Sequence, residues 1–295
     1  MSRIEKALEK AAQLRNSASA AAEPGKEQPS APLLRESQPT RQTSLYNPTG
    51  VVNINPNNLF LTTLNDPDSV ASEEYRKLKS ILVKLTKGEK FNNVLMVTSA
   101  IAAEGKSITS LNLAISLARE FDHTVLLIDA DLRRPSIHKY LGVEPGFGLA
   151  DCLADGVDLG KTIINTGIGK LSIIPAGKVL QNPLEFFTSQ KMQDLIAEIK
   201  HRYPDRYVII DTPPYLPFAE TRSLSHMVDG IIFVIKEGLA SQESIKEALE
   251  ALKGCNLLGV VFNDATISSL DGRYKDYNYS RTSYELPLAQ DGGKK

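Results

Sequence analysis

The chain has 295 residues, which is enough for one sizeable domain with tails. Its hydrophobic content of 42% and charged content of 23% are those of an ordinary globular protein, and a net charge of −1 gives no electrostatic case for nucleic acid as a partner. No apolar run is long enough to span a bilayer, and the charged N-terminus lacks the apolar core of a signal peptide. We therefore expect a cytoplasmic protein that reaches the membrane only through a partner.

Cysteine and histidine are sparse. Cys152 and Cys255 lie in apolar contexts, which favours buried free thiols over a disulfide bridge. The four histidines are scattered without the spacing of metal ligands, which argues against a metal site built on them; they are His123, His138, His201 and His226.

Residues 1–18 form a predicted amphipathic helix, because apolar side chains recur every three or four positions and the opposite face carries Glu and Lys. Two interpretations stay open: a solvated helix that packs on its own domain, or a docking helix for a partner. Residues 19–65 are predicted to be a disordered or extended linker. Up to residue 45 this linker has too little apolar surface to offset its chain entropy, and residues 46–67 should run extended over the domain.

A helix is predicted from about residue 69 to residue 87. Glu73, Arg76 and Lys79 recur at three-residue intervals and share one face of this helix. On spacing alone they form a solvated, charged face.

The core, predicted to span residues 66–265, alternates apolar strands with amphipathic helices. The strands are expected at 93–99, 124–129, 171–174, 207–211, 229–235 and 256–262, and the helices at 105–120, 135–141, 191–202, 219–227 and 241–253. The strands are continuous runs rich in Val and Ile, which is typical of a parallel sheet buried on both faces. The expected fold class is therefore α/β, with a mostly parallel sheet and helices on both faces.

The first core strand leads into a loop that ends in Gly105-Lys106-Ser107, and a helical pattern follows at once. Strand, loop and helix N-terminus in this order are what a phosphate-binding loop requires. Gly105 lets the backbone approach a phosphate, Lys106 supplies a positive charge, and the Ser107 hydroxyl can bind Mg²⁺. The backbone N–H groups from Ala103 to Ile108, Glu104 included, should hold the phosphates.

Two further strands end in carboxylates. Asp129 and Asp131, with Arg133, follow one strand, and Asp211 ends another. Ligands of open α/β sheets bind beyond the carboxyl ends of the strands, so these side chains should gather around Lys106. We expect Asp211, together with Ser107, to hold the metal ion, and Asp129 is a further candidate ligand.

Residues 266–295 form a predicted tyrosine-rich tail. Four tyrosines stand within eleven residues with almost no aliphatic partner; they are Tyr274, Tyr277, Tyr279 and Tyr284. A hairpin of tyrosine-rich strands is one interpretation, and an exposed segment that presents phenol hydroxyls is the one we favour.

These motifs together resemble the bacterial tyrosine kinases (BY-kinases), autokinases of exopolysaccharide loci with a deviant P-loop fold shared with partitioning ATPases. The loop that ends in Lys106 resembles their Walker A motif, residues 126–135 their Walker A′ segment, and residues 208–214 their Walker B motif. The opening residues 2–10 resemble, less specifically, the subgroup found with exosortase loci.

The resemblance implies roles for single residues. One of the Walker A′ carboxylates would assist the metal and the other would contact or deprotonate the incoming hydroxyl, and we favour Asp129 as that base. Arg133 would neutralise developing charge or anchor the Asp pair. Asn263, just past the last core strand, would contact adenine. In the family the counterpart of the Glu73/Arg76/Lys79 face, with Arg in place of Lys79, lies at a subunit interface.

The resemblance also implies ATP and Mg²⁺, autophosphorylation of the four tail tyrosines, and a homo-oligomer. Its implied partners are a transmembrane polysaccharide chain-length regulator and a cognate tyrosine phosphatase, and its location is peripheral to the inner membrane. Two alternatives remain: a dimerising ATPase switch, or a nucleotide-binding scaffold with weak turnover. The scaffold interpretation remains possible because Ala102-Ala103 replaces the family's usual Pro-Gly, and an Ala held at positive φ is strained.

Overall fold

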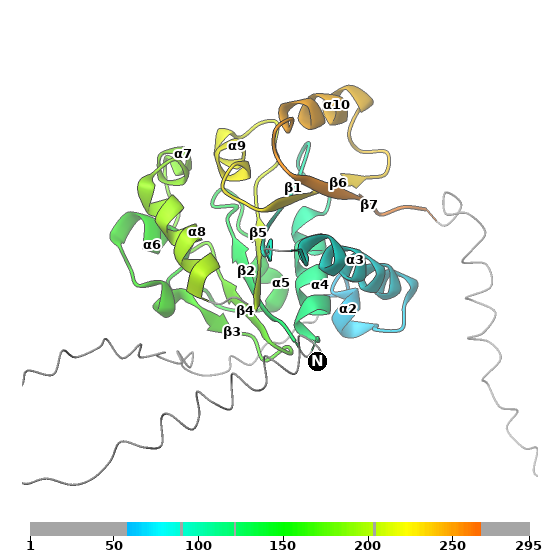
Figure 1. Ribbon diagram of the computed structural model, residues 1–295, viewed down its shortest axis with the longest axis horizontal. Coiled ribbons are helices and arrows are strands. Elements are labelled where there is room, and N and C mark those ends of the chain that lie inside the picture. Colours follow the sequence, from blue (N-terminus) through cyan, green and yellow to red (C-terminus); the bar gives the residue numbers. More distant parts are fainter. Residues whose placement is uncertain (1–57, 89–90, 121, 203–204, 267–295) are drawn as a thin grey trace, which may run out of the picture. The chain divides into compact units, whose positions relative to one another are not determined.

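The computed structural model describes residues 58–88, 91–120, 122–202 and 205–266 (Figure 1). The predicted helix 1–18, the predicted linker up to residue 57 and the tail from residue 267 lie outside the described residues. The four proposed phosphoacceptor tyrosines fall in that tail. None of the described helices is both long and apolar enough to cross a membrane.

The centre of the domain is one seven-stranded sheet in the order β3-β4-β2-β5-β1-β6-β7. All neighbours pair in parallel except β3, which runs antiparallel to β4. The strands are β1 (Val94–Ser99), β2 (Thr124–Asp129), β3 (Ile164–Asn165), β4 (Leu171–Ile174), β5 (Arg206–Asp211), β6 (Gly230–Lys236) and β7 (Leu257–Asn263). The predicted fold class and all six predicted strands are confirmed, and only the two-residue β3 was missed.

Helices cover both faces of the sheet (Figure 1). Side chains of α6, α7, α8, α9 and α10 pack on one face, and those of α3, α4 and α5 on the other. The helices on the first face are α6 (Leu149–Asp155), α7 (Pro183–Phe187), α8 (Gln190–Arg202), α9 (Ala219–Ser225) and α10 (Gln242–Ala251), with the 3₁₀ turn η1 (Leu159–Thr162) beside α6. The others are α2 (Thr62–Asn65), α3 (Val70–Thr86), α4 (Lys106–Ala118) and α5 (Ile137–Leu141).

The extended path expected for residues 46–67 is wrong for residues 62–65, which form α2. Leu61 is fully buried against the domain, and the Thr63 amide donates to Asn112 Oδ1 of α4 at 3.0 Å. The Arg119 guanidinium adds a bond to the Thr63 carbonyl at 2.6 Å. Polar bonds to α4, in addition to one buried Leu, therefore attach this short stretch to the core.

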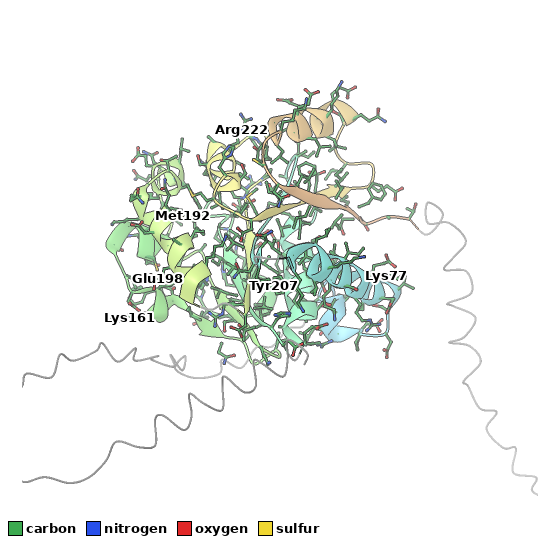
Figure 2. The ribbon with its side chains drawn as sticks, in the orientation of Figure 1. Lys77, Lys161, Met192, Glu198, Tyr207 and Arg222 are labelled. Atoms are coloured by element: carbon green, nitrogen blue, oxygen red, sulfur yellow. The ribbon has the colours of Figure 1, made fainter. Side chains whose placement is uncertain are left out.

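An aromatic cluster around Tyr207 lies at the amino-terminal end of β5, and Tyr207 itself lies in the interior (Figure 2). Its hydroxyl shares a 2.7 Å hydrogen bond with Thr86 Oγ1, and its ring meets Phe91 and His123 edge to face. The hydroxyl is thus satisfied away from water, as a buried tyrosine requires. The cluster fixes the end of α3 against β5.

The three charged side chains predicted on one face of α3 form two kinds of ion pair, one within the helix and one with a residue outside it. Arg76 bonds Glu73 on its own helix at 2.7 Å, near the surface. Lys79 instead pairs with Glu120, just past α4, at 2.6 Å. Exposed pairs of this kind contribute about 0–1 kcal/mol each. Lys79 therefore serves a contact within the chain, and Glu73 and Arg76 remain on the exposed side.

Both cysteines are free, as predicted. Cys152 is buried, and burial raises the pKa of its thiol. The expected burial of Cys255 is wrong: this residue is partly exposed, with its sulfur 3.5 Å from Ser225 Oγ and 3.7 Å from His226 Nδ1.

Candidate active site

A cavity of about 650 Å³ lies at the carboxyl ends of the central strands. It is lined by the loops after β1, β2, β5 and β7, which the parallel sheet brings to one edge. The predicted site residues that line it are Ala103, Gly105, Lys106, Ser107, Ile108, Asp131, Arg133 and Asn263. Three other predicted residues, Glu104, Asp129 and Asp211, are fully buried and do not line it.

The loop between β1 and α4 has the backbone that a phosphate cradle needs. Gly105 has a φ of 87° and precedes the first residue of α4, and Ala103 has a φ of 67°. The left-handed conformation expected at Ala103 is thereby confirmed, and an L-residue pays for it with about 1–2 kcal/mol of strain.

Glu104 shapes this loop from within. Its Oε2 accepts the Ile101 amide at 2.9 Å, and its side chain is fully buried. The side chain therefore points into the loop, and the predicted role of Glu104 in phosphate binding stays with its backbone N–H.

Asn263 holds the loop from the far edge of the sheet. Its Nδ2 donates to the Glu104 carbonyl at 2.9 Å, across 159 residues of sequence. A Cβ built on Gly105 would stand 2.0 Å from the same nitrogen. The contact therefore requires glycine at position 105, for reasons of space as well as of φ.

Lys106 lies at the start of α4 and forms an ion pair with Asp131, with Nζ 3.1 Å from Oδ2. Burial alone would lower the pKa of Lys106, but the carboxylates of Asp211, Asp131 and Asp129 outweigh burial and raise it. The ammonium is thus kept charged at the floor of the cavity.

Asp129 caps the segment that leads into α5. Its Oδ2 accepts the Ser136 and Ile137 amides at 3.0 and 3.1 Å, and its Oδ1 accepts the Asp131 amide at 3.2 Å. Burial and the nearby charge of Asp211 raise its pKa to about 7, while the two α5 amides oppose that rise. With both oxygens bonded to the backbone and no surface in the cavity, Asp129 is poorly placed for the role of base that we favoured.

Asp211 ends β5 directly beneath the loop. Its Oδ1 accepts the Ser110 hydroxyl at 3.1 Å, and its fully buried Oδ2 has no hydrogen-bond partner among the described residues. Burial raises its pKa to about 6, against the opposing charge of Lys106 and the nearby Ser107 and Ser110 hydroxyls. A lone buried carboxylate oxygen beside a serine hydroxyl fits Mg²⁺, which takes one or two carboxylates and otherwise phosphate and water oxygens.

Across the ranges that the structure describes, no three His, Cys, Asp or Glu side chains lie together as a ready-made metal site.

Arg133 does not anchor the Asp pair. Its Nε donates to the buried carboxylate of Glu220 at 2.5 Å, and its guanidinium lies 4.8 Å from the centre of the Phe218 ring. Both contacts come from the segment that follows β5. They fix the guanidinium at the wall of the cavity, where it can meet an anion.

Sequence reasoning missed several residues of this site, and two of them, Glu220 and Phe60, bear on its chemistry. Glu220, the partner of Arg133, lies 87 positions away in the chain, and no local pattern links the two. Phe60 lines the cavity from a stretch that was predicted to be linker. The only sequence signal for it is an aromatic residue just before a buried leucine.

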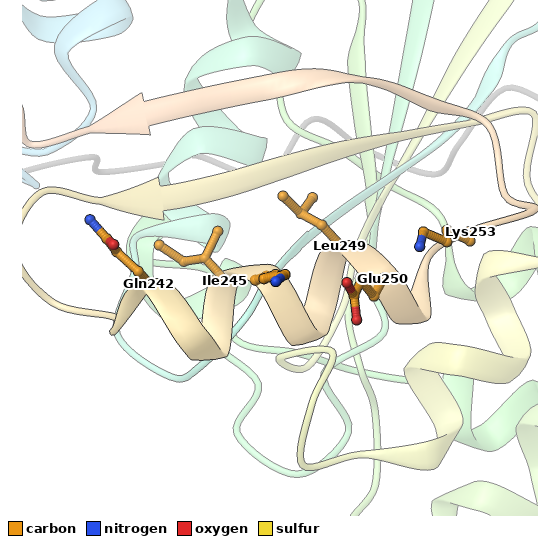
Figure 3. Close-up of a pocket in the computed structure, with 6 residues that line it drawn as sticks. Gln242, Ile245, Leu249, Glu250 and Lys253 are labelled. Carbon is orange, nitrogen blue, oxygen red and sulfur yellow. The ribbon is translucent and has the colours of Figure 1, made fainter.

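A second hollow, of about 360 Å³, lies along α10 and contains none of the predicted site residues. Figure 3 shows Leu249, Ile245 and Gln242 on the side of α10 that is turned toward the neighbouring strands. Since one helix alone lines it, the hollow lacks the convergent polar groups of a ligand site.

Residues 94–257 match the family of AAA domains. Tyrosine-protein kinase YwqD of Bacillus subtilis is 33% identical over 221 residues, which are 74% of this chain and 90% of the relative. Tyrosine-protein kinase etk of Escherichia coli (strain K12) is 34% identical over 206 residues, 69% of this chain but only 28% of that longer relative. Among solved structures, the kinase domain of the E. coli tyrosine kinase ETK aligns with a TM-score of 0.64 at 31% identity, covering 70% of this chain and 82% of that one.

Proposed function

Since the chain belongs to the bacterial tyrosine-protein kinases, we propose that it transfers the γ-phosphoryl group of ATP to tyrosines of its own C-terminal tail. The observation that carries the proposal is the meeting of Lys106 and Asp131 at one end of a single cavity, with Asp211 buried close behind them, under a loop with the backbone of a phosphate cradle. Phosphoryl transfer needs mostly positioning and charge stabilisation, and this arrangement supplies both.

Phosphate binding falls to the loop after β1. The backbone amides from Ala103 to Ile108 lie at or just before the N-terminus of α4, where the helix dipole favours anions. Lys106 neutralises phosphate charge after exchanging its partner Asp131 for the substrate. Arg133, oriented by Glu220, offsets the charge that develops during transfer.

The Ser107 hydroxyl and the unpartnered Oδ2 of Asp211 are the groups that would hold Mg²⁺. A bound Mg²⁺ supplies charge neutralisation for the phosphates. We no longer include Asp129 among the metal ligands, because backbone amides occupy both of its oxygens.

Asp131, rather than Asp129, is our proposed base. It lines the cavity, and its Oδ1 accepts the Arg134 amide, so the carboxylate is held in place while Oδ2 faces Lys106. The tyrosine oxygen forms a bond to the γ-phosphorus, the bond from that phosphorus to the bridging oxygen breaks, and ADP leaves with that oxygen. The phenol proton passes to Asp131.

The acceptors we propose are Tyr274, Tyr277, Tyr279 and Tyr284, reached in a neighbouring copy of the chain, with Glu73 and Arg76 as the contact between copies. Each phosphate adds about −1.5 to −2 charges, so a phosphorylated tail would be repelled by the carboxylates of the site and the oligomer would loosen. In this proposal the cycle regulates exopolysaccharide synthesis or export with a membrane chain-length regulator, at the cytoplasmic side of the inner membrane.

The test is incubation of the full chain with labelled ATP and Mg²⁺, followed by mass spectrometry of the tail. We expect phosphotyrosine within residues 274–284, abolished when all four tyrosines are changed to Phe, and a smaller particle after phosphorylation. ATP hydrolysis without phosphotyrosine would instead assign the chain to the switch ATPases.

A nucleotide-binding scaffold remains a second candidate because of one observation, the positive φ of Ala103. Strain in the loop weakens the nucleotide-bound state. A strained loop of this kind would be sufficient for a chain that binds ATP but does not turn it over. In the same experiment, nucleotide binding with neither hydrolysis nor phosphotyrosine would favour the scaffold.

A further inference from the structure

Phe60 is an exposed aromatic side chain in the wall of the cavity. It is 67% exposed, and it lines the same space as Ala103, Gly105 and Asn263. Exposure of one apolar side chain is ordinary on a protein surface. The informative feature of Phe60 is that its ring lines a cavity, where an aromatic face can meet a ligand.

The backbone beneath Phe60 is held firmly. The Phe60 carbonyl accepts Asn112 Nδ2 of α4 at 2.8 Å, and its amide donates to Asn58 Oδ1 at 3.0 Å. Leu61, the next residue, is fully buried. Asn112 also bonds the Ile108 carbonyl at 3.0 Å, which connects Phe60 to the first turns of the helix that follows the phosphate loop. The ring therefore has a defined place at the cavity mouth.

The place of residues 58–65 in the fold shows at which end of the cavity Phe60 lies. Figure 1 shows α2 and α3 on the side of α4 opposite to α5, and their cluster includes Leu258 and Val261 of β7. The reacting groups Asp131 and Arg133 follow β2, whereas β7 is four strands further along the sheet and ends at Asn263. Phe60 thus enters from the β7 side, away from the carboxylates.

We propose that Phe60 stacks on the base of the bound nucleotide. The inference rests on the proposed ATP site and adds a binding residue to it. A purine with its phosphates on Gly105 and Lys106 extends from the loop toward Asn263, whose Nδ2 is already engaged by the Glu104 carbonyl. The Asn263 amide oxygen remains to accept a hydrogen bond from the base edge, and Phe60 offers the apolar face that this end otherwise lacks.

The chain contains no tryptophan, so Phe60→Trp creates a single fluorescent reporter in the full-length protein. We expect ADP to change this fluorescence and inorganic tripolyphosphate, which has no base, to leave it unchanged. Leu59→Trp is the matched control: Leu59 is 87% exposed and adjacent but does not line the cavity. It should respond to neither probe.

Calorimetry then measures the contribution of the ring. Phe60→Ala should weaken ADP binding by about 5- to 100-fold, the usual loss when an aromatic platform under a base is removed. Its affinity for tripolyphosphate, and the ADP affinity of Leu59→Ala, should stay within about twofold of the unchanged chain.

The outcomes separate the two proposals. Equal loss of ADP and tripolyphosphate affinity in Phe60→Ala would overturn stacking, since it would mean a distorted loop. ADP binding that depends on Lys106 but not on Phe60 would overturn the inference and leave the nucleotide site intact. If the unchanged chain binds no ADP, the proposed function itself fails.

Discussion

The two ends of the cavity differ in how the chain builds them. The inner end holds the half-buried Lys106 and the buried Asp131, with Asp211 buried behind them, after three adjacent strands. These side chains are bonded to one another or to the nearest helix. The outer end holds Phe60 and Asn263, which are more exposed and come from opposite ends of the domain sequence. The inner end is charged and rigid, as chemistry requires; the outer end is mostly neutral and depends on contacts between distant segments. Substitutions at the inner end should therefore affect mainly turnover, and those at the outer end mainly nucleotide affinity.

The largest effect is expected at the inner end, from Asp131→Asn. Loss of a general base should lower kcat for tyrosine phosphorylation by about 10²- to 10⁴-fold, while ADP affinity changes far less. Asp129→Asn is the matched control. It places an amide N–H against backbone donors, so it should lower the free energy of unfolding by about 1–3 kcal/mol. Single-turnover kinetics and urea unfolding measure the two effects, and the reverse pattern would return the base to Asp129.

Next in size is Lys106→Met, which removes the positive charge under the phosphates. We expect roughly a 10²- to 10³-fold loss of turnover, on the scale of removing one electrostatic donor from a transition state. Lys178→Met is the control, because Lys178 forms a surface pair with Asp155 away from the cavity. Turnover of Lys106→Met equal to that of the control would refute the phosphate site.

Gly105→Ala tests the junction between the two ends. Its Cβ would meet Asn263 at 2.0 Å, and a φ of 87° strains any L-residue. A penalty of about 1–2 kcal/mol for φ alone corresponds to roughly tenfold weaker ADP binding, and the overlap adds to it. Asn263→Ala removes the overlap, so in that background Gly105→Ala should keep only the φ part of its cost. Calorimetry on the two single variants and the double variant checks this, and no loss from Gly105→Ala in the Asn263→Ala background would show that φ imposes no cost.

The smallest effect is expected from Ala103→Gly, which relieves a φ of 67°. Removal of about 1 kcal/mol of strain should tighten ADP binding by roughly fivefold. Ala102→Gly, at a position without positive φ, should give no gain. Equal affinities for Ala103→Gly and the unchanged chain would mean that the loop carries its alanine without cost.

Most of the inner end could be predicted from the sequence, because it is determined locally. Continuous apolar runs identify β1, β2 and β5 to within a residue, and a parallel sheet brings their carboxyl ends together. The division of roles between Asp129 and Asp131 could not be predicted. It depends on the path after β2, which turns the amides of Ser136 and Ile137 back onto Asp129.

The outer end resisted prediction because distance along the chain hides its contacts. Phe60 is fixed by Asn112, which lies 52 residues away, within a stretch whose Asn and Pro content favoured an extended linker. Helix α7 is a different case: Asn182-Pro183 with Glu185 following is a recognisable helix start that our prediction overlooked. The four-residue α2 and two-residue β3 are too short for periodicity to reveal.

The bond between Asn263 and the Glu104 carbonyl joins the phosphate loop to the outermost strand of the sheet. Only β6 pairs with β7 among the described strands, and Val260 and Phe262 lie exposed along it, so this strand should open more readily than the core. When it opens, the loop loses its outer support at the same moment, and amide exchange in the two segments should proceed together. The lifetime of the closed loop is then set by the rate at which β7 opens at the sheet edge, and a bound nucleotide would be released at that rate.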